Sequence, residues 1–104
     1  MTAWYVIRSK PRQEALAQEN LQQQGYETFL PLILESRPRR QRTVRVVAPL
    51  FPSYLFAFID TATQSIGPIR STLGAMGLVR FGDRMPTVPE PVIAELQRNT
   101  DPET

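Results

Sequence analysis

The sequence predicts an α+β domain in which one mainly antiparallel sheet of four or five strands is flanked by helices. Three observations lead to this class. Runs of aromatic and β-branched residues, which are typical of strands, recur along the chain. Good helix formers fill residues 12–24, and an amphipathic segment lies at residues 91–99. The length of 104 residues suits a single domain, 1–104, with one core.

The first third of the chain predicts a strand, a helix and an extended segment. Residues 4–7, WYVI, are aromatic or β-branched and indicate a first strand. Pro11 suits the first turn of the following helix, and Gly25 suits a left-handed residue at its end. Residues 27–34 are extended and apolar, and Pro31 marks an edge, a bulge or a break within them.

An arginine-rich hairpin is expected near residues 35–45. Its arms are predicted at residues 32–35 and 43–47, with a mobile tip between them. Two interpretations of the tip stay open: a solvated loop that keeps the protein soluble, or a basic arm that reaches phosphates. Five arginines fall in nine residues: Arg37, Arg39, Arg40, Arg42 and Arg45.

The second half of the chain contains the strongest strand signal, SYLFAFI at residues 53–59. Residues 61–73 predict a loop with a short helix, residues 78–81 a short strand, and residues 86–89 an extended segment. Residues 91–99 predict the last helix. Its apolar side consists of Val92, Ile93 and Leu96.

Both faces of the SYLFAFI strand are apolar, because alternate side chains point to opposite faces of a sheet. Tyr54, Phe56 and Phe58 share one face, and Leu55, Ala57 and Ile59 share the other. A central strand buried on both sides would explain the pattern. A face that keeps an exposed aromatic patch for a partner is the alternative.

The composition argues against an enzyme. The chain has no Cys and no His, which excludes a disulfide framework, a zinc finger and imidazole chemistry. No carboxylate pair has a spacing that stacks it on one helical face. We therefore expect no catalytic residue, metal, cofactor or small-molecule substrate. Apolar runs are far shorter than a membrane span and no secretory signal is visible, so we expect a cytoplasmic protein without a membrane partner.

Charge is distributed unevenly along the chain. Residues 1–45 hold eight basic and four acidic residues, whereas residues 83–104 hold two basic and five acidic ones. This asymmetry predicts a basic face for nucleic acid or another acidic surface. Arg8, Lys10 and Arg12 form a second basic group before the first helix, where a helix N-terminus favours a bound phosphate. The same three residues would also be explained as ordinary surface charges.

Three motifs resemble the N-terminal (NGN) domain of the NusG/RfaH/Spt5 family of transcription elongation factors. They are WY at 4–5, LFPSYLF at 50–56 and GLVRFG at 77–82, and the resemblance is closest to the RfaH branch. It implies an NGN-like α/β sandwich that docks on the clamp helices of the largest catalytic RNA polymerase subunit. It also implies bridging of the DNA cleft to the other large subunit, suppression of pausing, and contact with non-template DNA.

The resemblance also implies site residues. The polymerase-binding residues would be Trp4, Phe51, Tyr54, Phe56, Phe81 and Ile93. Together with the charge pattern, the resemblance indicates these nucleic-acid-binding residues: Arg8, Lys10, Arg12, Arg39, Arg40, Arg42 and Thr72.

Three features depart from the RfaH branch. Leu73 stands where that branch carries an arginine for DNA, and residues 64–68 lack the His/Thr-rich run by which that branch touches the second large subunit. Sequence-specific recruitment and the exact bridging contact are therefore left open. No KOW domain follows within the 104 residues. The alternative to an elongation factor is a small α+β RNA-binding or ribosome-associated module, in which sheet aromatics would stack on bases. Here the aromatics stand among Leu and Ile, which suits a protein partner better.

Overall fold

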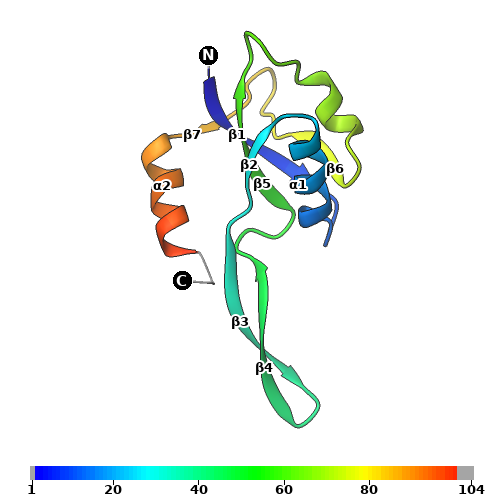
Figure 1. Ribbon diagram of the computed structural model, residues 1–104, viewed down its shortest axis with the longest axis vertical. Helices are drawn as coiled ribbons and strands as arrows, with labels where there is room; N and C mark the ends of the chain where they lie inside the picture. Colours follow the sequence, from blue (N-terminus) through cyan, green and yellow to red (C-terminus); the bar gives the residue numbers. More distant parts are fainter. Residues whose placement is uncertain (1, 101–104) are drawn as a thin grey trace.

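The computed structural model describes residues 2–100. Its elements form a body with a long hairpin projecting from it (Figure 1). This architecture confirms the predicted α+β class. In chain order the elements are β1 (Thr2–Ser9), α1 (Glu14–Gln23), β2 (Glu27–Phe29), β3 (Leu32–Arg39), β4 (Arg42–Pro49), β5 (Tyr54–Asp60), the 3₁₀ helix η1 (Gly67–Ser71), β6 (Ala75–Leu78), β7 (Thr87–Val88) and α2 (Glu90–Asn99).

The body is built on a five-stranded antiparallel sheet. Its order is β2-β5-β1-β6, and β7 also pairs with β1. The central pair is β1 with β5, in register from Thr2 opposite Asp60 to Arg8 opposite Tyr54. The strongest strand signal of the sequence therefore lies in the middle of the sheet, between β2 and β1.

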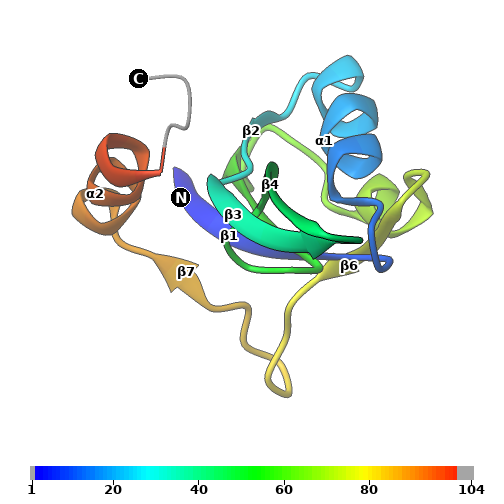
Figure 2. The same ribbon diagram turned by 90° about the horizontal axis from the view of Figure 1, so that it is seen from below.

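Helices cover the two faces of this sheet from opposite sides (Figure 2). Leu55, Ala57 and Ile59 of β5 are fully buried on the face covered by α1, where they belong to the main core with Ala17 and Leu21. The opposite face carries a smaller cluster beneath α2, formed by Trp4, Phe56 and Ile93. The alternation predicted for residues 53–59 thus separates two distinct cores.

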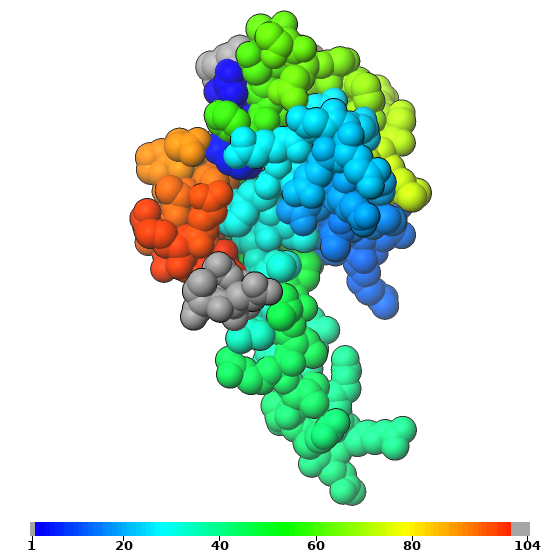
Figure 3. Space-filling view, viewed as in Figure 1, coloured from blue at the N-terminus to red at the C-terminus, as the bar shows by residue number. Residues whose placement is uncertain are grey.

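The hairpin β3–β4 forms a separate two-stranded sheet. Its register runs from Leu32 opposite Pro49 to Arg39 opposite Arg42. The prediction of short arms with a long tip was wrong. Strand pairing continues to Arg39 opposite Arg42, which leaves only Arg40 and Gln41 in the turn. Arg40 has φ +53°, and a positive φ is what two-residue hairpin turns require. The ribbon extends as a narrow arm in the space-filling view (Figure 3).

The ends of α1 differ in how well the sequence predicted them. The helix begins at Glu14 rather than near Pro11, because Gln13 N–H donates to Lys10 C=O at 3.0 Å and closes a separate turn. Arg12, inside this turn, has φ +62° and cannot be helical. Gly25 follows the helix with φ +94°, as predicted. Pro31 lies between β2 and β3 and marks the predicted break.

Two corrections concern the last third of the chain. The strand predicted at residues 78–81 lies earlier, at β6, and Val79 N–H makes the next bond, to Val6 C=O at 2.8 Å. Phe81 leaves the sheet and pairs only with Arg84 in an isolated bridge. On α2, Ile93 is buried, whereas Val92 is exposed, because successive residues are turned by about 100° around the helix axis.

Candidate functional site

Helix α2 covers only one end of its sheet face. Trp4 is buried there, its ring centroid 5.1 Å from that of Phe58, and its indole Nε1–H donates to Glu90 Oε2 at 2.8 Å. Ile93 of α2 is buried against the same cluster. Trp4 and Ile93, which the resemblance placed in a docking pocket, therefore lie inside the domain and fasten α2 to the sheet.

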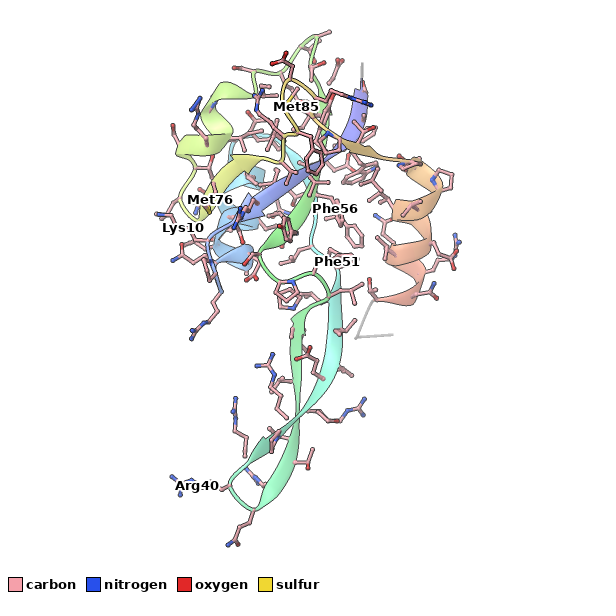
Figure 4. All side chains as sticks on the ribbon, turned by 180° about the vertical axis from the view of Figure 1, so that it is seen from behind. Lys10, Arg40, Phe51, Phe56, Met76 and Met85 are labelled. Carbon is pink, nitrogen blue, oxygen red and sulfur yellow. The ribbon has the colours of Figure 1, made fainter. Side chains whose placement is uncertain are left out.

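The other end of this face is open and aromatic. Phe51 and Tyr54 are 40% and 37% exposed, whereas Phe56 beneath them is only 7% exposed. The Phe51 ring meets Phe56 edge-on with a centroid distance of 6.1 Å, and Phe29 stacks on Phe56 at 6.2 Å. Figure 4 shows Phe51 and Phe56 together, near the point where the hairpin leaves the body. We call Phe51, Tyr54 and Phe56 the aromatic patch.

The turn that carries Phe51 is held from two sides. The buried Glu14 of α1 accepts a hydrogen bond from Ser53 N–H on its Oε2 at 2.7 Å, and Ser9 N–H of β1 donates to Ser53 C=O at 2.8 Å. Ser53 has φ +71°, a conformation uncommon for a residue other than glycine. Sequence reasoning missed this role of Glu14, because no local pattern indicates a partner 39 residues away.

Phe81 does not contact the rings of the aromatic patch. It is strongly exposed on the turn after β6, where it lines a hollow of about 340 Å³ with Arg84 and Met85. Within residues 2–100, no ring contact joins Phe81 to another aromatic side chain. Of the six residues expected to bind polymerase, the structure therefore brings only Phe51, Tyr54 and Phe56 together as a surface.

The predicted basic corner is present at the end of β1. Arg8, Lys10 and Arg12 are all exposed, and none forms an ion pair with another described residue. Arg8 lies opposite Tyr54 in the sheet register, which places this charge next to the aromatic patch. Lys10 N–H donates to Gly74 C=O at 2.9 Å, so the corner is tied to the loop before β6.

Thr72 does not belong to this exposed surface. Its side chain is buried, its hydroxyl donates to Pro68 C=O at 3.0 Å, and the same oxygen accepts a hydrogen bond from Gln24 Nε2 at 2.8 Å. The hydroxyl therefore ties η1 to the end of α1. The expectation of a DNA contact at Thr72 is not supported, whereas Leu73 beside it is exposed.

The hairpin tip is the second basic surface. Arg39 and Arg42 are cross-strand partners, which sets two like charges opposite each other next to Arg40. Such a pairing is destabilising without a counter-ion. Arg37, further back, is paired with Glu35 at 2.7 Å. The tip residues line a hollow of about 680 Å³: Arg39, Arg40, Gln41, Arg42 and Val44.

The two basic surfaces do not form one cluster. Figure 4 shows Lys10 on the body and Arg40 at the far end of the hairpin. A partner that contacts both surfaces must therefore be extended. This geometry suits a nucleic-acid backbone, whose charge is spread along its length.

The described residues contain neither an arrangement for metal binding nor a membrane span. Within residues 2–100, no three metal-ligating side chains gather in a way that could hold an ion. No helix in the same range has the length and apolarity needed to cross a membrane. Glu95 on α2 has a lowered pKa, because Asn99 and then Arg98 donate hydrogen bonds to its carboxylate, but this group lies on the exposed surface.

The described residues thus form an α+β domain with an open aromatic patch and two exposed basic surfaces. Residues 2–97 match the model of the family described as transcription termination factor NusG. The chain therefore belongs to the NusG family of transcription factors, whose members bind RNA polymerase. The match does not distinguish the branches of this family, so membership of the RfaH branch stays a prediction.

Proposed function

We propose that this domain docks through the aromatic patch on the clamp helices of the largest catalytic RNA polymerase subunit. From there the domain bridges to the other large subunit, closes the DNA cleft and suppresses pausing of the polymerase. We place this activity in the cytoplasm. The observation that carries this proposal is the partial cover of one sheet face. Helix α2 buries Trp4 at one end, and two aromatic rings at the other end stay more than one-third exposed.

The patch has the properties of a protein-docking surface. Aromatic side chains that stand in a partly formed pocket make strong binding anchors, because a partner completes their desolvation. Phe51 already rests on Phe56, so its ring is held in place before a partner arrives. The hairpin adds two exposed apolar side chains, Leu34 and Val47, which are cross-strand partners. A helix that lays apolar side chains on such a surface would bury these four side chains.

The basic surfaces complete the proposal on the nucleic-acid side. Arg8, Lys10 and Arg12 are unpaired and exposed close to the aromatic patch, so the DNA in the cleft lies within their reach when the patch is docked. Guanidinium and ammonium groups bind phosphates through charge-assisted hydrogen bonds. We place non-template DNA on this corner, without base readout, because no sequence-reading arrangement is evident there.

Replacement of the exposed rings tests the docking surface. Phe51→Ala and Tyr54→Ala should each weaken binding to purified RNA polymerase by about 2 kcal/mol or more, which is about thirty-fold in Kd. Circular dichroism and thermal unfolding should show that both variants stay folded. Val92→Ala, which removes an exposed apolar side chain from α2, is the matched control and should bind normally.

The same measurements separate the competing interpretations. Phe81→Ala tests the third exposed aromatic independently, since it makes no ring contact with the patch. Normal polymerase binding by both folded patch variants would sink the docking proposal. If those variants lost affinity for RNA and kept it for polymerase, the RNA-binding module would be the better description.

A further inference from the structure

The loop that follows β5 lies at the end of the molecule opposite the hairpin (Figure 1). We call residues 61–66 the distal loop. Strand β5 begins at Tyr54 of the aromatic patch and has seven residues. The distal loop therefore starts about 20 Å from the patch. A domain that bridges two walls of a cleft needs a second contact surface that is distant from the first, and the distal loop has this position.

The distal loop presents an uncharged polar surface. No charged residue occurs from 61 to 69, and Thr61, Thr63 and Ser65 are exposed. Without a cation, this surface suits a protein partner better than a phosphate backbone. Short hydroxyl side chains bind a partner through hydrogen bonds, which weaken steeply when the distance or the angle is wrong. The contribution of the loop therefore depends on how accurately the loop is held.

The distal loop sets part of its own shape. Thr63 N–H and Gln64 N–H donate to Asp60 C=O at 3.1 and 2.8 Å. Ala62 N–H donates to Asp60 Oδ1 at 3.0 Å, and Gln64 Oε1 accepts from Asp60 N–H at 2.9 Å. These bonds close the turn on the end of β5. All of them are local, so they do not fix the loop relative to the rest of the body.

Tyr26 connects the distal loop to the main core. It follows Gly25 at the end of α1, and its side chain is buried in the cluster that contains Leu21. The Tyr26 hydroxyl donates to Ser65 C=O at 2.5 Å, across 39 positions of sequence. Gln64 Nε2 makes a second, longer bond of 3.5 Å to Gly25 C=O. The end of α1 thus sets the position of the loop on the body.

We propose that Tyr26 is a positioning residue, whose hydroxyl holds Ser65 so that the distal loop meets the other large polymerase subunit in one orientation. The proposal rests on the proposed function, because bridging follows docking on the aromatic patch. The ring of Tyr26 packs in the core without help from its hydroxyl, and the patch lies at the other end of β5. Loss of the hydroxyl therefore affects bridging and leaves docking intact.

Pause lifetimes at increasing concentrations of the whole chain separate docking from bridging. The assay is single-round transcription with purified RNA polymerase. The concentration that gives half of the effect reports docking, whereas the effect at saturation reports the bridged fraction of docked complexes. Tyr26→Phe should lower the bridging equilibrium about two- to ten-fold, as loss of one hydrogen bond does, and the effect at saturation should fall with it. Phe51→Ala should raise the half-effect concentration and keep the full effect.

Two further variants make the test selective. Gln64→Ala removes the second side-chain anchor and should also lower the effect at saturation. Tyr5→Phe is the matched control, because it removes a hydroxyl from another buried tyrosine of the same core. Within residues 2–100, the Tyr5 hydroxyl makes no hydrogen bond to the distal loop. Tyr5→Phe should behave like the unmodified protein.

Amide hydrogen exchange measures the position of the loop without polymerase. The amides of Thr63 and Gln64 should exchange faster in Tyr26→Phe than in Tyr5→Phe, because the turn that protects them is no longer tied to the core. Circular dichroism should show that all variants are folded. Equal exchange in both variants would mean that the hydroxyl does not hold the loop, and the proposal would be wrong.

Failure of the positioning role and failure of the proposed function give different results. An unchanged effect at saturation for folded Tyr26→Phe, or an equal loss for Tyr5→Phe, would overturn the positioning role and leave docking in place. A change in the half-effect concentration alone would also overturn it. If Phe51→Ala changes nothing and Tyr26→Phe lowers the effect at saturation, the docking surface is wrong and the positioning role stands. If the unmodified protein shortens no pause, both are wrong.

Discussion

Glu14 is the one charged side chain within residues 2–100 that is buried. Burial of a carboxylate costs free energy unless the carboxylate is hydrogen-bonded. Ser53 N–H donates such a bond to the Glu14 carboxylate at 2.7 Å. The bond also fixes a turn whose Ser53 has a positive φ, a conformation that costs free energy in a residue with a Cβ. One side chain thus holds the position from which Phe51 reaches the aromatic patch.

Removal of this carboxylate should destabilise the domain. Glu14→Ala leaves Ser53 N–H without its acceptor, and we expect the free energy of unfolding to fall by about 1–3 kcal/mol. Glu14→Gln keeps an acceptor oxygen and should lose less. Urea unfolding measures both, with Glu19→Ala, an exposed glutamate on the same helix, as control. Identical unfolding midpoints for Glu14→Ala and Glu19→Ala would contradict the anchoring role.

Phe56 and Phe51 touch each other but should respond differently to truncation. Phe56→Ala removes a buried ring that contacts both Phe29 and Phe51, and we expect the free energy of unfolding to fall by about 3–5 kcal/mol. Phe51→Ala removes a ring that is already 40% exposed and should cost much less. Thermal unfolding of the two variants distinguishes them. A similar melting temperature for both would show that the ring of Phe56 is not needed in the core.

At the scale of the element, the hairpin holds its charges in a regular ladder. Continuous pairing from Leu32 to Arg39 fixes the spacing of the arginines along β3. Side chains of alternate residues share a face, so Arg37 and Arg39 lie on the same side of the ribbon as Arg42, the cross-strand partner of Arg39. An ordered ribbon of this kind loses less conformational entropy on binding than a mobile loop would.

Neutral replacements at the tip should change the salt dependence of DNA binding. Exchange of Arg39, Arg40 and Arg42 for Ser should flatten the log–log slope for single-stranded DNA by up to about 2, because each lost phosphate contact removes about 0.7. The measurement is anisotropy of a labelled oligonucleotide at several salt concentrations. Gln41→Ala with Thr43→Ala alters the same tip without changing charge and is the control. An unchanged slope in the triple variant would assign the hairpin to solubility or to a protein contact.

At the scale of the whole molecule, the hairpin makes the domain elongated. Its extents are 52 × 29 × 27 Å, and Phe51 and Phe56 of the aromatic patch lie near the point where the hairpin leaves the body (Figure 4). The hairpin tip, with Arg40, therefore lies far from the aromatic patch. Such a shape allows one rigid domain to contact polymerase and DNA at separate places, as docking across a cleft requires.

Residues 1–104 alone should therefore shorten pauses. Docking and bridging need a rigid body with separate contact surfaces, and the candidate surfaces all lie within this chain. The assay is single-round transcription with purified polymerase on two templates, one with a candidate recruitment element and one without it. We expect shorter pause lifetimes on both templates. Measurable polymerase binding without an effect on either template would contradict the prediction and indicate that the bridging contact, expected near residues 64–68, is missing.

The sequence by itself determined the class of the fold and most of its elements. The alternation of SYLFAFI, the Gly25 terminator and the Pro31 break all act locally, through steric preferences of one or a few residues. The tertiary register confirmed these predictions. The same local logic predicted a basic corner and an arginine-rich hairpin, because charge clusters that are close in the sequence stay close in the fold.

Only the tertiary structure decided which aromatic side chains remain exposed. Tyr54, Phe56 and Phe58 share one face by alternation, yet Tyr54 is exposed and Phe56 is buried. The difference comes from α2, which packs on one end of that face through Ile93 and Trp4, residues that are distant in the sequence. The Glu14–Ser53 bond arises in the same way. Burial and long-range contacts depend on how whole elements pack, and no local pattern of residues contains that information.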